Sequence, residues 1–101
     1  MGEQSRMSTE NYPSDETLAA TRREINEIDH KLLELLNRRL DIVRTLHEHK
    51  VRAGLPLRDM AREESMVEEL VEANTGTLSP TGVRRFFTHL LDLIREEIHG
   101  A

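Results

Sequence analysis

Residues 15–53, DETLAATRREINEIDHKLLELLNRRLDIVRTLHEHKVRA, form the stretch that decides the fold. No glycine or proline interrupts it, and its apolar residues recur at spacings of three and four, the pattern of one amphipathic helix: Leu18, Ile25, Ile28, Leu32, Leu35, Leu36, Ile42, Val43 and Leu46. Such a helix is about 58 Å long, whereas a compact chain of this size has a radius of gyration of about 13 Å. Either the helix protrudes or a second copy covers it. We expect an intertwined homodimer.

The end of this helix and two further helices are also marked in the sequence. Gly54-Leu55-Pro56 stops the first helix, because glycine favours the C-terminal cap and proline cannot continue the helix. Asp59 is a suitable N-terminal cap for a second helix over residues 60–73. Ser79-Pro80 then begins a third helix, with proline at its favoured first position, and Gly100 closes it.

The whole chain therefore reads as all-α, with one long helix and two shorter ones. No useful length of sequence alternates with the period of two that strands require. Residues 1–14 are polar and lack apolar periodicity, so we expect a disordered N-terminal tail followed by a three-helix domain over residues 15–101.

Composition excludes several classes of function. The chain has 101 residues, no cysteine, 33% charged residues and a net charge of −5. The absence of cysteine excludes disulfides and thiolate metal sites, and an acidic chain is a poor general partner for nucleic acid. No apolar run approaches the roughly 20 residues of a membrane span, and no apolar stretch of a signal peptide follows the first residues, so we expect a cytoplasmic protein. A group of cations in this acidic chain favours a specific pocket for an anion.

Three cations in the long helix are candidates for such a pocket. Arg39 and Lys50 are eleven residues apart, which places them about 20° apart around the helix and about 16 Å apart along it. Two long side chains on one face could hold one small ligand between them. Arg22 lies about 25 Å before Arg39, so it can reach the same ligand only from the partner protomer of an antiparallel pair. The alternative is that all three are solvated surface cations.

A family resemblance supports the pocket. The chain resembles the all-helical (AroQ-type) chorismate mutases over residues 17–99, specifically in its first two-thirds and weakly in the last helix. The matching residues are Arg22, Ile25, Ile28-Asp29, Lys31 to Leu36, Arg38-Arg39, Lys50 and Gly54 to Glu63. The resemblance implies an interlocked three-helix dimer. It also implies an isomerase that rearranges chorismate to prephenate, on the route to phenylalanine and tyrosine, with no metal or cofactor.

The resemblance further implies roles for the three cations. Arg22 of one protomer and Arg39 of the other match the arginines that clamp the two substrate carboxylates, a task that suits a planar guanidinium. Lys50 matches the lysine that bonds the ether oxygen and a carboxylate. Because this rearrangement needs no proton transfer, holding a compact conformer and stabilising charge on the ether oxygen can suffice for catalysis.

The second and third helices supply the remaining candidates. By the resemblance, Asp59 and Glu63 face the ring hydroxyl of the substrate, with Arg62 beside them. The last helix departs from the family, because well-studied bacterial members place a serine and, four residues later, a glutamine or glutamate near the ether oxygen. Those positions are Ile94 and Ile98 here. Losing one such donor typically costs about 100- to 1,000-fold in rate.

Several readings stay open at this stage. The chain could be a mutase that is weak alone and activated by docking onto the first enzyme of the shikimate pathway, DAHP synthase, as some short members of the family are. It could act on an analogue, as a mutase of amino-deoxychorismate or a lyase of isochorismate. From another class, it could be a non-catalytic helical subunit with a regulatory or docking task.

Overall fold

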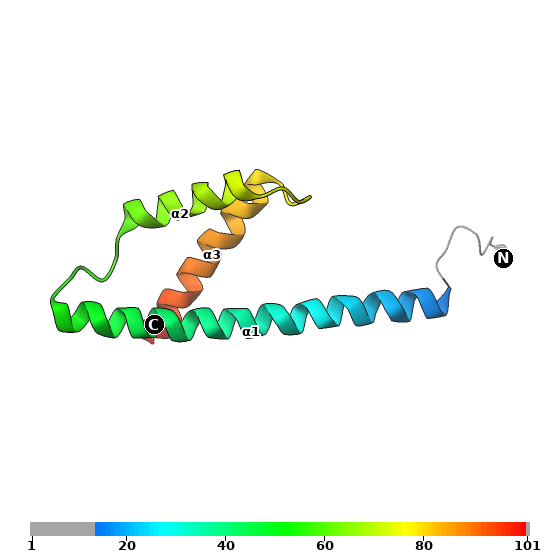
Figure 1. Cartoon of the computed structure of the whole chain (residues 1–101), viewed down its shortest axis with the longest axis horizontal. Helices are drawn as coiled ribbons and strands as arrows, with labels where there is room; N and C mark the ends of the chain where they lie inside the picture. Colours follow the sequence, from blue (N-terminus) through cyan, green and yellow to red (C-terminus); the bar gives the residue numbers. More distant parts are fainter. Residues whose placement is uncertain (1–13, 101) are drawn as a thin grey trace. The chain divides into compact units, whose positions relative to one another are not determined.

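The computed structural model describes residues 14–100 (Figure 1). These residues form three helices, α1 (Asp15–Ala53), α2 (Met60–Ala73) and α3 (Pro80–His99), and contain no strand. The predicted all-α class and the three predicted helices are confirmed. The predicted disordered tail lies outside the described residues, apart from Ser14. Of the three helices between residues 14 and 100, none is both long enough and apolar enough to cross a membrane.

Internal packing divides the chain within α1 into two parts, residues 1–38 and residues 39–101, and each is described by itself. The described portion of the first part is the N-terminal stretch of α1. Ser14 caps it, because its Oγ accepts a hydrogen bond from the Thr17 backbone N–H at 3.1 Å. Asp15 and Glu16 lie in the first turn, where negative charge suits the positive end of the helix dipole.

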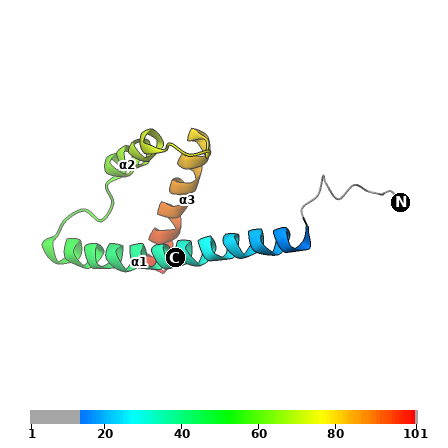
Figure 2. The same cartoon turned by 45° about the vertical axis from the view of Figure 1, so that its right-hand side comes forward.

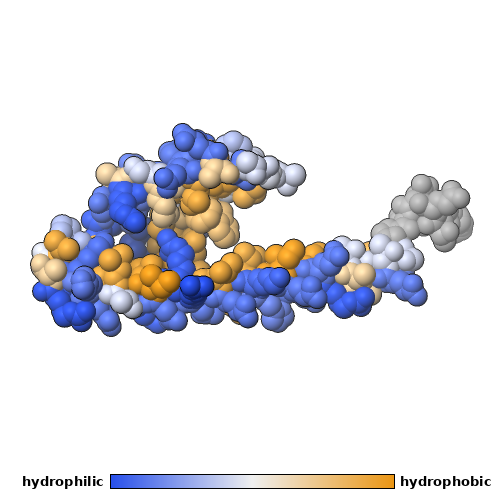
Figure 3. All heavy atoms as spheres, in the orientation of Figure 1, coloured by the Kyte–Doolittle hydropathy of each residue, from blue (hydrophilic) through white to orange (hydrophobic). Residues whose placement is uncertain are grey.

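Most apolar residues of α1 are exposed in a single copy of the chain. None of the 39 residues of α1 is buried, and its large apolar side chains that face solvent keep between 37% and 60% of their surface exposed. Figure 3 shows apolar side chains gathered along this helix. The largest exposed fractions belong to Leu35, Ile42, Ile28, Leu33 and Val51. An apolar stripe of this length gains free energy when another surface covers it.

The second part contains the end of α1 together with α2 and α3. Figures 1 and 2 show α3 leaving the turn after α2 and running back so that its last turns lie beside α1, ahead of the C-terminal end of that helix. There the Arg44 Nη2 donates to the Glu97 carbonyl oxygen at 3.3 Å. The buried residues of this part are Val67 in α2 and Val83 and Ile94 in α3. The small core of the described residues is thus formed by the two short helices.

The C-terminal end of α1 is a Schellman motif. The Leu55 N–H donates to the Lys50 carbonyl oxygen at 2.9 Å, and the Gly54 N–H donates to the Val51 carbonyl oxygen at 3.2 Å. Gly54 has a φ of +68°, a left-handed conformation that glycine adopts without the steric cost of a Cβ. The motif fixes the backbone of Lys50 in the last turn of the helix.

The caps of the short helices follow the predicted residues. The Asp59 Oδ1 accepts a hydrogen bond from the Arg62 N–H at 3.0 Å and begins α2. The Ser79 Oγ accepts one from the Gly82 N–H at 2.9 Å and begins α3, with Pro80 at its first position. Gly100 ends α3 in the left-handed conformation. One carboxylate oxygen of Asp59 therefore has a structural task at the start of α2.

Candidate functional site

Seven of the eight site residues predicted from the sequence line one pocket of about 240 Å³ in residues 39–100. The end of α1, the connection to α2, α2 itself and α3 all contribute to it. The seven residues are Arg39, Lys50, Asp59, Arg62, Glu63, Ile94 and Ile98. The eighth, Arg22, lies in the part of α1 that belongs to residues 14–38, where it is exposed. The short connection after Gly54 thus brings residues from three helices to a common pocket.

The pocket is positively charged although the chain is acidic. Five cationic side chains line it against two carboxylates, an excess of three positive charges when the histidines are neutral: Arg39, Lys50, Arg58, Arg62 and Arg95 against Asp59 and Glu63. The whole chain has a net charge of −5. Cations gathered in a concave site concentrate the potential there and favour a small, multiply charged anion.

Arg39 has unused hydrogen-bonding capacity. Its Nη1 is buried and has no hydrogen-bond partner within the described chain, and its Nη2 lies 4.0 Å from the Sδ of Met66, a weak acceptor. A buried donor without a partner costs about 1–3 kcal/mol, so a ligand oxygen at this position would remove that cost. This guanidinium is therefore the pocket group that is best suited to bind an anionic oxygen of a ligand.

One wall of the pocket is apolar. Ile94 is 4% exposed, and Ile98, one turn later in α3, is half-buried. Leu91 of α3 and Val43 of α1 line the same pocket. These are the two positions at which the family resemblance predicts polar groups. In this chain they give the pocket a hydrophobic surface against which a carbon ring could pack.

Two arginines that line the pocket, Arg58 and Arg95, were not predicted as site residues from the sequence. The Arg95 Nη1 donates to Oε1 and Oε2 of Glu63 at 3.0 and 2.9 Å, and the Arg58 Nη2 lies 3.4 Å from Oε1. The signal for Arg95 was present, because it interrupts the apolar face of α3 between Leu91 and Ile98, four residues after the first and three before the second. Glu63 is therefore anchored by charge on both sides.

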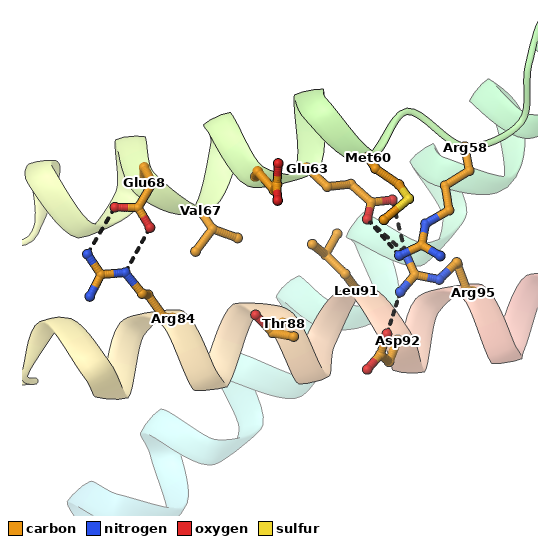
Figure 4. Close-up of a pocket in the computed structure, with 11 residues that line it drawn as sticks. Arg58, Met60, Glu63, Val67, Glu68, Arg84, Thr88, Leu91, Asp92 and Arg95 are labelled. Carbon is orange, nitrogen blue, oxygen red and sulfur yellow. Dashed lines mark hydrogen bonds and ion pairs between the residues drawn. The ribbon is translucent and has the colours of Figure 1, made fainter.

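A second cavity, of about 580 Å³, lies between α2 and α3, and Glu63, Arg95 and Arg58 line both it and the first pocket (Figure 4). At its other end, the Arg84 Nε and Nη2 donate to the two carboxylate oxygens of Glu68 at 2.8 and 3.0 Å. These hydrogen bonds lower the pKa of Glu68 and raise that of Arg84. The exposed pair ties α2 to α3 away from the cationic pocket.

The ring of His47 meets the ring of His99 edge to face, with centroids 5.0 Å apart, and both residues line the pocket. Within residues 14–100, no three histidine, aspartate or glutamate side chains are grouped so that they could hold a metal ion. The charged groups that line the pocket are guanidinium, ammonium and carboxylate groups, and they lie beside an apolar wall.

Comparison with known proteins agrees with this geometry. The sequence model of the family described as chorismate mutase type II matches residues 21–98. The chain is similar to a bifunctional chorismate mutase/prephenate dehydratase of Buchnera aphidicola subsp. Schizaphis graminum, with 35% identity over 85 residues, which cover 84% of this chain and 21% of that protein. It is also similar to a chorismate mutase of Methanocaldococcus jannaschii, with 34% identity over 55 residues, or 54% of this chain and 56% of the relative.

A solved structure has a similar fold. The chorismate mutase (form I) of Thermus thermophilus superposes with a TM-score of 0.74 and 27% sequence identity, covering 76% of this chain and 96% of that one. The chain spans about a fifth or less of the length of the bifunctional relatives that it matches. The similarity to those relatives therefore concerns one domain of a longer protein.

Proposed function

Because the chain belongs to the chorismate mutase type II family, we propose that it catalyses the rearrangement of chorismate to prephenate. The observation that carries the proposal is the pocket with three excess positive charges against an apolar wall. Chorismate is a dianion with a carbon ring, so its carboxylates and its ring fit those two features. The reaction breaks the ether C–O bond as a new C–C bond forms, and it needs no proton donor, metal or redox group.

The pocket residues divide the task between them. Arg39, with a buried guanidinium nitrogen that has no partner in the described part of the chain, binds a carboxylate of the substrate. Lys50, whose backbone the Schellman motif holds, donates to the ether oxygen as negative charge grows there. Glu63 and the free oxygen of Asp59 accept the ring hydroxyl, with Arg62 beside them. The compact conformer is held for reaction because these contacts converge from three helices.

We propose further that the protein works as an intertwined homodimer in which Arg22 completes the partner's pocket. The exposed apolar residues of α1 support the dimer, because a second copy would remove them from water. The length of α1 supports the contribution of Arg22, since 17 residues of helix, about 25 Å, separate it from Arg39 of its own chain. Each pocket would then hold both carboxylates of the substrate between arginines of two protomers.

An assay of chorismate loss and prephenate formation tests the proposal. We expect purified protein to turn chorismate over and Lys50→Ala to lower kcat by at least about 100-fold, because one donor to the developing charge is lost. Arg52→Ala is the matched control, since Arg52 lies in the same last turn of α1, is exposed and does not line the pocket. Unchanged turnover in Lys50→Ala would refute the role given to Lys50.

The apolar positions Ile94 and Ile98 favour a second candidate, a helical subunit that binds its ligand but needs a partner for activity. We propose DAHP synthase as this partner. We also propose that the protein acts in the cytoplasm. The assay is therefore run with and without that enzyme. Activity only in its presence identifies an activated mutase, and chorismate binding without turnover in either condition identifies a regulatory subunit. Turnover of amino-deoxychorismate or isochorismate in preference to chorismate would identify the analogue as substrate.

A further inference from the structure

The Glu63 carboxylate has a fixed set of partners in the walls of the pocket. The Arg95 Nη1 donates to both of its oxygens, at 3.0 and 2.9 Å, and the Arg58 Nη2 lies 3.4 Å from Oε1 (Figure 4). Arg95 is itself oriented by Asp92, to which its Nη2 donates. A carboxylate has about four acceptor positions, so Glu63 retains capacity for one more donor after these contacts.

Partial burial strengthens the Arg95–Glu63 pair relative to other ion pairs of the chain. The two side chains are 27% and 23% exposed, against 47% and 54% for Arg84 and Glu68, which join the same two helices. Charge-assisted hydrogen bonds are stronger where solvent screens them less. Arg95 and Glu63 both line the cationic pocket, whereas Arg84 and Glu68 do not.

From these contacts we infer that Arg95 is a positioning residue, one that holds the Glu63 carboxylate at the wall of the pocket so that its remaining acceptor position faces the ring hydroxyl of the substrate. The inference rests on the proposed mutase function, and it adds Arg95 to the residues that support that function. Arg95 also brings a positive charge beside Glu63, which offsets the repulsion between that carboxylate and an incoming dianion. Without Arg95, Glu63 would be free to leave the hydroxyl and to repel the substrate.

This role predicts a particular kinetic signature. The ring hydroxyl does not react, so its hydrogen bond to Glu63 is present in the ground state and in the transition state. Loss of such uniform binding raises KM more than it lowers kcat. A hydrogen bond to a charged group is worth roughly tenfold or more in an equilibrium constant, so Arg95→Gln should lower kcat/KM by about 10-fold, mainly through KM.

The experiment compares Arg95→Gln with wild type and with a matched control variant, on two substrates. Arg84→Gln is the matched control, because it removes an arginine–glutamate pair between the same helices outside the cationic pocket. The second substrate is a chorismate analogue that lacks the ring hydroxyl. We expect Arg95→Gln to lose activity toward chorismate and not toward the analogue, and Arg84→Gln to lose it toward neither. In a Glu63→Gln background, Arg95→Gln should have little further effect.

The outcomes separate the two proposals. Wild-type protein that turns over neither substrate, alone or with the partner enzyme, overturns the mutase function and the role of Arg95 with it. Active wild-type protein with an unchanged Arg95→Gln variant, or with equal losses on both substrates, overturns the role of Arg95 alone. If thermal unfolding shows that Arg95→Gln does not fold, Arg95→Lys, which keeps a cation for Glu63, carries the same comparison. The loss of activity in Arg95→Lys must again be confined to the turnover of chorismate.

Discussion

Arg39 of α1 directs its Nη2 toward the thioether sulfur of Met66 in α2, at 4.0 Å. The other terminal nitrogen of this guanidinium is buried and has no hydrogen-bond partner among residues 14–100. A strong donor thus meets a weak acceptor inside the pocket, and the chain keeps a group that does little for its own stability. Such groups are common where binding, rather than folding, has shaped the residue.

This relationship predicts opposite effects of one substitution on stability and on activity. Arg39→Met removes the unpartnered buried donor and keeps apolar bulk against α2. We expect the free energy of unfolding in urea to stay unchanged or to rise by up to about 1 kcal/mol, while kcat/KM falls by at least about 100-fold. Arg38→Met is the control, since the neighbouring arginine is exposed and does not line the pocket. A large loss of stability in Arg39→Met would contradict this account.

The apolar end of α3 permits a gain-of-function test. Ile98 is half-buried in the pocket wall, so Ile98→Gln should place an amide donor near the ether oxygen and raise kcat by about 10-fold or more. The lost burial is below the roughly 1.5–3 kcal/mol of a fully packed isoleucine. Ile94 is 4% exposed, so Ile94→Ser should cost about 2–4 kcal/mol, chiefly in stability. Lower stability in Ile98→Gln without any gain in rate would place Ile98 away from the reacting atoms.

A mixing experiment tests the shared pocket. Chains carrying Arg22→Ala and chains carrying Arg39→Ala are each expected to be inactive, because every pocket of either homodimer lacks one arginine. A heterodimer of the two contains one pocket with both substitutions and one with neither, so about half of the activity per dimer should return. Heterodimers verified by mass that remain inactive, or a monomeric mass for the active protein, would exclude the arrangement.

The exposed pair of Arg84 and Glu68 predicts a pH dependence. Hydrogen bonds from Arg84 lower the pKa of Glu68 in the folded chain, so its contribution to stability is present above the ordinary glutamate pKa of about 4.3 and is lost as the pH falls through the lowered value. Wild type should therefore melt slightly above Glu68→Gln at pH 7, and the difference should shrink as the pH falls below about 4.3 and through the lowered pKa. Added salt should also reduce it. A difference that stays constant as the pH is lowered through this range would show that the pair does not act through its charge.

The sequence was sufficient to predict the helices, because their limits depend on local chemistry. Asp59, Ser79 and Gly100 act within one turn of the backbone that they cap. The sequence also predicted that Arg39 and Lys50 share a pocket, since a helix fixes their relative angle. It did not predict Arg95 as the partner of Glu63, because that contact joins residues 32 positions apart on different helices. The packing of α3 beside α2 determines it, and no local pattern encodes that packing.

The solvent-facing apolar stripe of α1 has a consequence for how the stability of this protein would depend on its concentration. If a second copy covers that stripe as proposed, folding and association are one reaction, and each tenfold dilution removes about 1.4 kcal/mol of stability per dimer. At protein concentrations near the dissociation constant of the dimer, activity would then rise more than in proportion to the total concentration of chains. A cell that changes the expression of this protein would change the active fraction as well as the number of chains. Abundance itself would act as a control on flux, without any effector molecule.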